Sequence, residues 1–418
     1  MVKTNKQCRY CNHRKISRFL DLGSAPLSNA YISPEKLDEP ELFYPLRVSR
    51  CTKCSLVQTE NSPLPAEIFT NDYAYFSSTS EAWLIHTKKF AEMVVNRFAL
   101  NKSSLVIEIA SNDGHLLRLF DRQKIPCIGI EPTDSTASYA ESKGSNVIKG
   151  FFDKSLAKRL ARNQQQADLV VANNVLAHVP DVKDFAEGVS KLIKRNGVLS
   201  IEFPHFLNLL KFKQFDTVYH EHYSYLTLRF IITLLKNCGM RVFSCEELTT
   251  HGGSLRVLAC KNNADHETEQ SVGMVLETEI QFGLFDTETY NSVQPDANTI
   301  KNDFIKFLIG EKTKGRKVAG FGAAAKGNTL LNYSGIRSDL VAFVCDNAKS
   351  KQHKFCPGSK IPIVPPEIIS EKQPDTIIVF TWNIFDEIKI AIRNYIKKPT
   401  KLVVAVPRIE EFVIQPLK

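Results

Sequence analysis

The chain has no long hydrophobic run and no apolar leader. Its 418 residues contain no stretch of about eighteen apolar residues, the length that a membrane-spanning helix needs. The first residues, MVKTNKQCRYCNHRK, lack the apolar stretch of a signal peptide. We therefore expect a cytoplasmic protein that neither spans a membrane nor is exported.

Internal repeats, low-complexity tracts and a concentrated basic patch are also missing. The formal net charge is +9, but the basic residues are dispersed along the chain. Such a mild excess serves a phosphorylated small molecule as easily as nucleic acid, and its dispersal weakens the case for nucleic acid. The length favours two or three domains, and 43% hydrophobic residues allow a large core.

Four of the ten cysteines are paired in sequence, as CRYC and CTKC. These pairs, Cys8 with Cys11 and Cys51 with Cys54, offer four thiolates to a tetrahedral zinc ion. Four thiolates leave no open coordination position, so the zinc would be structural. Accidental pairs and two redox pairs are the alternatives. The other six, expected to be buried reduced thiols, are Cys127, Cys238, Cys245, Cys260, Cys345 and Cys356.

Strand and helix signals alternate from about residue 66 onwards. A helix is expected from Ser80 as N-cap, with Trp83, Phe90, Val94 and Phe98 on one face. Strands are expected at 104–110, 126–132, 147–152, 168–176, 197–204 and 254–261. This order is typical of a doubly wound, mostly parallel sheet.

A second alternation follows SVQPDANTIKNDF, which we interpret as a connector. Strand signals recur within 317–328, 340–347, 375–383 and 401–407, with a helix near 384–398. We therefore predict an α/β protein of three domains: a zinc-binding module (1–65), a Rossmann-like domain (66–265) and a smaller Rossmann-like C-terminal α/β domain (266–418).

The turn after the first strand of this sheet indicates the cofactor. IEIASNDGHLL places an acidic residue, a tight turn and a helix start at the carboxyl edge of the strand. A dinucleotide needs several glycines here, whereas S-adenosylmethionine tolerates one. We predict S-adenosylmethionine; a dinucleotide and an empty fold stay open. Glu131 could accept both ribose hydroxyls or be a solvated carboxylate. The candidate cofactor contacts are Glu108, Ala110, Asn112, Gly114, Glu131 and Asn173.

The loop YHEHYSY, residues 219–225, concentrates groups that transfer protons. It follows the strand GVLSIEFP, so it should lie at the same carboxyl edge, as should His178. Histidine titrates near neutrality, and tyrosine can hydrogen-bond an oxyanion. This set suits removal of a proton beside a ketone. Structural packing, or a metal site formed by HEH, would be alternative roles.

Several motifs in a fixed order resemble one enzyme family. CxxC…CxxC, DYAYFSSTSEAW, EIASNDGHLL, NNVLAHVPD, DTVYHEHYSYLT, HGGSLRV, GFGAAAKGN and DTIIVFTWN cover nearly the whole chain. Together they resemble the sugar C-methyltransferases that methylate carbon 3 of nucleotide-linked 4-keto-6-deoxy sugars. The resemblance implies that the Rossmann-like domain at 66–265 is an S-adenosylmethionine-dependent methyltransferase domain. It also implies a structural Zn²⁺ and a C-terminal domain that helps to hold the nucleotide sugar.

The resemblance also implies roles for individual residues. His222 would be the base that takes the proton from carbon 3, while Tyr219, Glu221 and His178 would orient it and steady the enolate. Lys326 could bind the substrate or lie in a packed turn that binds no ligand. The Ser-Thr run 77–80 could line the cleft or serve only to cap a helix. The implied substrate contacts are Tyr75, Ser78, His251, Lys326, Asn328, Asp346, Lys354, Trp382 and Asn383.

The resemblance thus implies methyl transfer to carbon 3 through an enolate, in branched deoxysugar biosynthesis. The expected partner is a nucleotide sugar, without nucleic acid or membrane, and the expected state is a monomer or weak homo-oligomer. CDNAKSKQHKFCPG departs from the family's commoner loop, so thymidine and guanosine nucleotides both stay open. The alternatives are an O- or N-methyltransferase and a zinc-ribbon nucleic-acid binder.

Overall fold

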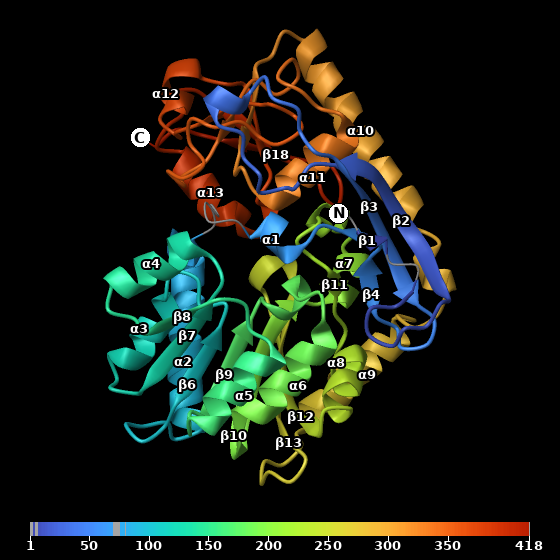
Figure 1. Cartoon of the computed structure of the whole chain (residues 1–418). Coiled ribbons are helices and arrows are strands. Elements are labelled where there is room, and N and C mark those ends of the chain that lie inside the picture. Colours follow the sequence, from blue (N-terminus) through green and yellow to red (C-terminus); the bar gives the residue numbers. More distant parts are fainter. Residues whose placement is uncertain (1–2, 5–6, 70–75, 80, 418) are drawn as a thin grey trace.

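The structure, a computed structural model, describes residues 3–4, 7–69, 76–79 and 81–417. Figure 1 shows three regions: a blue sheet at the N-terminal end, a central sheet and its helices in cyan to yellow, and an orange to red C-terminal region. Within the described residues, every helix is too short or too polar to cross a membrane. The domain limits drawn at residues 65 and 265 stay predictions.

The N-terminal region forms a small antiparallel sheet in the order β11-β4-β3-β2. Three strands come from this region, and β11 comes from the middle of the chain, within YHEHYSY. The long helix α10 (Val293–Thr313) packs beside β2 (Figure 1). The elements are β1 (Lys3–Thr4), β2 (Ile16–Ala25), β3 (Tyr44–Cys51), β4 (Val57–Thr59), β5 (Asn61–Ser62), α1 (Pro65–Ile68) and β11 (Ser224–Tyr225).

The central sheet has seven strands in the order β12-β13-β10-β9-β6-β7-β8. From β10 to β8 neighbouring strands are parallel, and β13 runs antiparallel to both of its neighbours. The chain continues from β6 to β7 and β8 on one side and then crosses to β9 and β10 on the other side. This reversal of strand order opens a crevice at the carboxyl ends of the strands. The strands are β6 (Val106–Ile109), β7 (Cys127–Glu131), β8 (Val147–Lys149), β9 (Ala167–Asn173), β10 (Ile193–Pro204), β12 (Met240–Leu248) and β13 (Ser254–Lys261).

Helices of this domain begin at polar caps. The side chains of Asp153, Asp181 and Thr227 each accept a hydrogen bond from a backbone N–H in the first turn of α5, α6 and α8. The helices are α2 (Glu81–Arg97), α3 (His115–Asp121), α4 (Asp134–Ser142), α5 (Lys154–Arg162), α6 (Val182–Leu192), α7 (Phe206–Lys211) and α8 (Leu228–Lys236).

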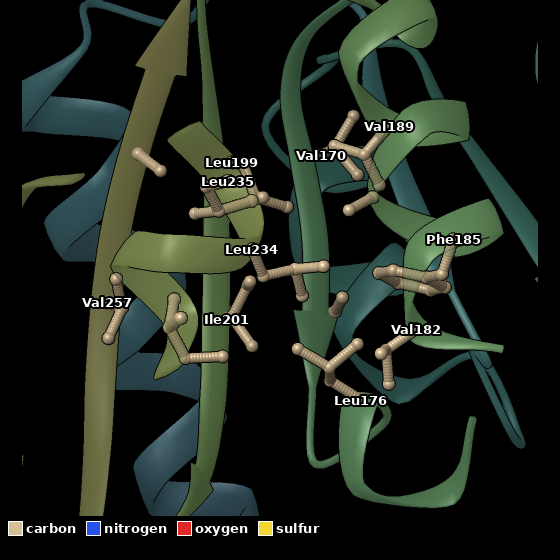
Figure 2. Close-up of a cluster of buried hydrophobic side chains, with 14 of the residues drawn as sticks. Val170, Leu176, Val182, Phe185, Val189, Leu199, Ile201, Leu234, Leu235 and Val257 are labelled. Atoms are coloured by element: carbon tan, nitrogen blue, oxygen red, sulfur yellow. The ribbon is translucent and has the colours of Figure 1, made fainter. Parts of the chain in front are cut away.

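A continuous apolar core joins the central sheet to α6 and α8. Figure 2 shows Phe185 and Val189 of α6 facing β9, and Leu234 of α8 beside Ile201 of β10. All four side chains are buried. This core fixes the strands whose carboxyl ends carry the candidate site.

The C-terminal region holds a six-stranded sheet in the order β16-β15-β14-β17-β18-β19. Only the edge pair β18 and β19 is antiparallel. The elements are α9 (Gln270–Gln281), α10 (Val293–Thr313), β14 (Val318–Phe321), α11 (Ala325–Ser334), β15 (Val344–Cys345), β16 (Ile363–Val364), α12 (Ile368–Lys372), β17 (Thr376–Val379), α13 (Phe385–Ile392), β18 (Thr400–Val404) and β19 (Glu410–Ile414).

The structure confirms the α/β class and corrects some local predictions. The supposed connector SVQPDANTIKNDF is helical, because Pro295 lies in the first turn of α10, where a missing N–H costs nothing. The strand predicted at 168–176 ends at Asn173 and gives way to a short 3-10 helix. Cys127 and Cys238 are half-buried, although the other four single cysteines are buried as expected. Ser80 lies outside the described residues.

Truncation of Leu234 tests the core. Leu234→Ala should lower the free energy of unfolding by about 2–5 kcal/mol, because it leaves a cavity beside Ile201. Urea unfolding monitored by circular dichroism measures the change. Met274→Ala, at a side chain that is 66% exposed on α9, should change it by no more than about 0.5 kcal/mol. Equal losses in the two variants would contradict the assignment of this core.

Candidate active site

A cavity of about 830 Å³ lies where the three regions meet. Asn29 and Phe69 line it from the N-terminal region, and Lys326 and Asn383 line it from the C-terminal region. The remaining wall consists of the carboxyl ends of the central strands and the loop that carries His222. A cavity of this size accommodates two small molecules side by side.

Left-handed backbone shapes the turn after β6. Ala110 and Asn112 have φ of 55° and 50°, and Gly114 has φ of 71°. A Cβ at position 114 would lie 2.9 Å from the Cβ of Ala140, so only glycine fits there. The backbone N–H of Asn112 donates to Glu131 Oε2 at 2.8 Å, which ties the turn to the end of β7.

Carboxylates gather at this end of the cavity and favour a cationic ligand. Burial, and then the neighbouring Asp113 and Glu131, raise the pKa of Glu108 well above its ordinary value. Glu108 Oε2 is buried at the cavity wall and finds no hydrogen-bond partner within the described part of the chain. A cationic amino group would satisfy that oxygen and favour the ionised carboxylate. The positively charged ammonium and sulfonium groups of S-adenosylmethionine fit this group of carboxylates.

The cavity wall also carries two histidines with defined tautomers. His222 Nδ1 lies 3.0 Å from the carbonyl oxygen of Thr217, and His178 Nδ1 lies 2.9 Å from that of Glu221. A carbonyl only accepts, so Nδ1 carries the hydrogen in each ring and Nε2 is left as the proton acceptor. The two rings contact each other edge to face, with centroids 4.9 Å apart, and the Tyr219 ring lies 4.0 Å from that of His222.

Burial keeps both imidazoles neutral. Desolvation lowers the pKa of His178 to about 4, and desolvation, followed by the nearby His178, lowers the pKa of His222 well below its ordinary value. A neutral ring can accept a proton from a bound ligand. An anion forming beside the ring would raise its pKa and strengthen it as a base.

The N-terminal region holds Glu221 of this loop. Asn29 Nδ2 donates to Glu221 Oε1 at 2.6 Å, and the Tyr31 hydroxyl donates to Asn29 Oδ1 at 3.2 Å. His220, the other histidine of HEH, instead places Nε2 3.1 Å from the carbonyl oxygen of Tyr44. The two histidines of HEH therefore do not converge on a metal ion.

Arg9, inside the first CxxC pair, clamps the same loop. Its guanidinium donates to the carbonyl oxygen of Thr59 at 2.9 Å, to Ser224 Oγ at 3.0 Å and to the carbonyl oxygen of Tyr223. Next to this clamp, β11 pairs with β4 in the antiparallel sheet. The backbone of the loop is thus part of the cysteine-bearing module.

The four paired cysteines form a site that fits zinc. Their Sγ atoms all lie within 4.8 Å of one another, with Cys8 and Cys54 3.5 Å apart and Cys11 and Cys51 3.6 Å apart. Four thiolates around Zn²⁺ at about 2.3 Å would be about 3.8 Å apart. Across the described ranges, this is the one group of ligand side chains that could hold a metal ion. The ion would fix the knuckle that contains Arg9.

Lys326 and Asp216 both contact Trp382 at the C-terminal wall of the cavity. Lys326 Nζ donates to Asn383 Oδ1 at 2.7 Å and lies 4.2 Å from the centre of the Trp382 ring. Burial lowers its pKa to about 8, while burial raises the pKa of Asp216 to about 6. The indole N–H of Trp382 donates to Asp216 Oδ2 at 2.7 Å. An anionic ligand in the cavity would favour the charged form of Lys326.

The motif HGGSLRV supports the cavity wall next to the C-terminal region. A Cβ at position 252 would lie 2.4 Å from the Trp382 ring, so the left-handed Gly252 lets the C-terminal region approach. Arg256 pairs with the fully buried Glu202 at 2.6 Å, and Glu202 also holds His86 at 2.8 Å. His86 in turn stacks on Trp83, which lines the cavity.

The structure brings most predicted site residues to the cavity, but not all of them. The residues that line it are Glu108, Ala110, Asn112, Glu131, Asn173, His178, Tyr219, Glu221, His222, His251, Lys326 and Asn383. Those described away from its lining are Ser78, Gly114, Asn328, Asp346, Lys354 and Trp382. Tyr75 lies outside the described residues.

Lys351, Trp83 and Asn29 are three of the lining residues that sequence reasoning missed. Lys351 reaches the cavity where Lys354, three positions later, was predicted, and Asp346 lies 3.5 Å from its Nζ. Only the placement of this loop distinguishes the two lysines. Trp83 was predicted only as part of one helix face, but it is half-buried and lines the cavity. Asn29 lies outside every motif, so no sequence signal identified it as a site residue.

The chain is similar to known methyltransferases along its length. Family models match residues 8–69 as a zinc binding domain, 83–244 as a methyltransferase domain and 249–407 as a C-methyltransferase C-terminal domain. The C-methyltransferase NovU of Streptomyces niveus is 31% identical over 407 residues, which cover 97% of both chains.

Two solved structures are more distant. Magnesium protoporphyrin IX methyltransferase from Synechocystis PCC 6803, with bound SAH, has 17% identity and a TM-score of 0.34, covering 43% of this chain and 83% of that one. A SAM dependent methyltransferase from Archaeoglobus fulgidus has 15% identity and a TM-score of 0.34, covering 44% and 100%.

Removal of the metal should release the loop at residues 219–225. Cys51→Ala should abolish zinc binding and speed amide exchange in this loop, because Arg9 and β4 lose their fixed position. Hydrogen–deuterium exchange with mass spectrometry measures the change, with peptides from β9 as an internal reference. Cys345→Ala, at a buried cysteine outside the cluster, should keep both the zinc and the slow exchange. Loss of zinc without faster exchange in the loop would refute this coupling.

His178 should stay uncharged in mildly acidic solution. Its pKa is lowered to about 4 by burial, from 6.5 for an ordinary histidine, so the unfolded chain binds this proton first. The stability that the neutral ring contributes is therefore lost as pH falls from about 6.5 towards 4. NMR of the imidazole nitrogens, assigned with His178→Gln, should show no titration between pH 8 and about pH 5. A midpoint above pH 6 would contradict the burial.

Proposed function

Because the chain belongs to the C-methyltransferase family and uses S-adenosylmethionine, we propose that it methylates carbon 3 of a nucleotide-linked 4-keto-6-deoxy sugar. One observation carries the proposal: His222 Nε2 is left as a proton acceptor in the cavity whose far end fits the cofactor. Such a base is needed for transfer to carbon, because a carbon nucleophile must first lose hydrogen.

His222 starts the reaction. Its Nε2 takes the proton from carbon 3, and the electron pair of that C–H bond delocalises onto the 4-keto oxygen as an enolate. When bound, S-adenosylmethionine would supply the electrophilic methyl group: its bond to sulfur breaks as carbon 3 takes up the methyl, S-adenosylhomocysteine is the leaving group, and the enolate returns to the ketone. His222, whose pKa burial lowers, then releases its proton readily. Much of the rate would come from holding the two reactants in line.

The neighbours of His222 hold it and the enolate. Tyr219, packed on the His222 ring, would steady the enolate oxygen by hydrogen bonding. His178 also packs against this ring, edge to face. Glu221 acts through its backbone carbonyl, which fixes His178, and through its carboxylate, which Asn29 holds.

The C-terminal wall would bind the diphosphate of the nucleotide. Lys326 and Lys351 both line the cavity there, beside the start of α11 at Ala325. Ammonium groups and a helix N-terminus both favour phosphate oxygens. Asp346, away from the lining, would orient Lys351 through their ion pair.

Methyl transfer to a panel of nucleotide-linked 4-keto-6-deoxy sugars tests the proposal. Wild-type protein with S-adenosylmethionine should give a carbon-bound methyl, located by mass spectrometry and NMR. His222→Asn should lower kcat about 10²–10⁴-fold, because it removes the base. His353→Asn, at an exposed histidine outside the cavity lining, should leave kcat unchanged.

Deuterium exchange separates this reaction from methyl transfer to oxygen or nitrogen. In D₂O without cofactor, wild-type protein should exchange the hydrogen on carbon 3, and His222→Asn should not. A methyl group found on oxygen or nitrogen, or wild-type transfer rates in His222→Asn with both ligands bound, would overturn the proposal.

A further inference from the structure

A second pocket, of about 220 Å³, lies between the N-terminal sheet and the segment that leads into α10. Ser17, Arg18 and Arg50 line it from β2 and β3, and Thr287 and Asn291 line it from the segment before the helix. None of these residues lines the large cavity. Its walls are mostly polar, which is unusual for a gap within a core.

Arg50, which lines this pocket, is a buried cation without an ion-pair partner in the described part of the chain. The residue is only 8% exposed, and its Nη1 has no hydrogen-bond partner in the described part of the chain. Its guanidinium lies over the Tyr290 ring, 4.8 Å from the centroid. Within the described residues, no carboxylate lies in ion-pair range of it.

The zinc site does not supply the missing charge. Arg50 precedes Cys51, but successive side chains of a strand point to opposite faces. Arg50 is paired in register with Ser17, another residue of the pocket, while Cys51 is paired with Ile16. The guanidinium therefore faces the pocket and not the thiolates.

The neighbouring Arg18 shows how a cation is normally compensated in this sheet. Its Nε lies 2.8 Å from Glu60 Oε1, and its Nη2 lies 2.5 Å from Glu60 Oε2. Arg50 lacks such a bidentate partner, and a buried unpaired charge is costly unless a ligand compensates it. The hydroxyls of Ser17 and Thr287 and the side-chain amide of Asn291 add donors at the exposed rim.

We propose that this pocket binds a small phosphate-type oxyanion, with the Arg50 guanidinium as its main ligand. A phosphate group presents several acceptor oxygens, and the fork of an arginine can donate to two of them. The volume exceeds that of one anion, so both free phosphate and the phosphoryl group of a small metabolite can enter. The site is independent of the large cavity and of the proposed function.

Calorimetric titration with inorganic phosphate, at constant ionic strength against chloride, tests the site. Wild-type protein should bind phosphate, and Arg50→Met should bind it about tenfold more weakly or worse, because a charged hydrogen-bond donor is lost. Arg47→Met removes the same charge from the same strand, where Arg47 pairs with Asp21 at 2.9 Å outside the pocket. Lys326→Met removes a cation of the large cavity. Both control variants should retain the Arg50-dependent binding.

Two further measurements complete the test. Thr287→Val, at the exposed rim, should also weaken binding, and it keeps the proposal testable if Arg50→Met does not fold. Glycerol 3-phosphate, titrated in parallel, separates the two sources: tighter binding of the ester indicates a small metabolite, and tighter binding of phosphate indicates the free ion. Absence of phosphate binding beyond the chloride control, equal binding by wild type and Arg50→Met, or an equal loss in Arg47→Met would overturn the proposal.

Discussion

The antiparallel pairing of β11 with β4 is the constraint on which the rest of the site depends. Through it, the loop that carries His222 becomes an edge of the cysteine-bearing sheet and is not a free connection between strands. The guanidinium of Arg9 adds a second attachment at the carbonyl oxygen of Tyr223. A zinc ion at the four cysteines would thereby help to fix the position of His222, the proposed base.

Burial then separates the chemistry of the two ends of the cavity. Carboxyl groups around Glu108 create a place for a cation, whereas the neutral rings of His178 and His222 create a place for proton transfer. Lys326 adds a partly neutralised cation at the C-terminal wall. Because each group is desolvated, a ligand of the complementary charge interacts more strongly than it would in water.

Sequence patterns predicted the parts of the molecule that obey local rules. Strand and helix alternation predicted the α/β class, the CxxC pairs predicted a cluster that the structure brings together, and the turn at 107–117 predicted the cofactor end. Contacts between distant segments followed no such pattern. Asn29 reaches Glu221 across 192 positions, and Lys351 replaces Lys354 at the cavity through the folding of one loop. The start of α10 was missed because a segment with a proline in its first helical turn looks like a linker in the sequence.

A crystal structure with S-adenosylhomocysteine and a 4-keto-6-deoxy nucleotide sugar would test the central claim most directly. We expect His222 Nε2 to lie about 3–3.5 Å from carbon 3, with β11 still paired to β4. A sugar whose carbon 3 lies against another side chain, with His222 turned away from it, would contradict the account.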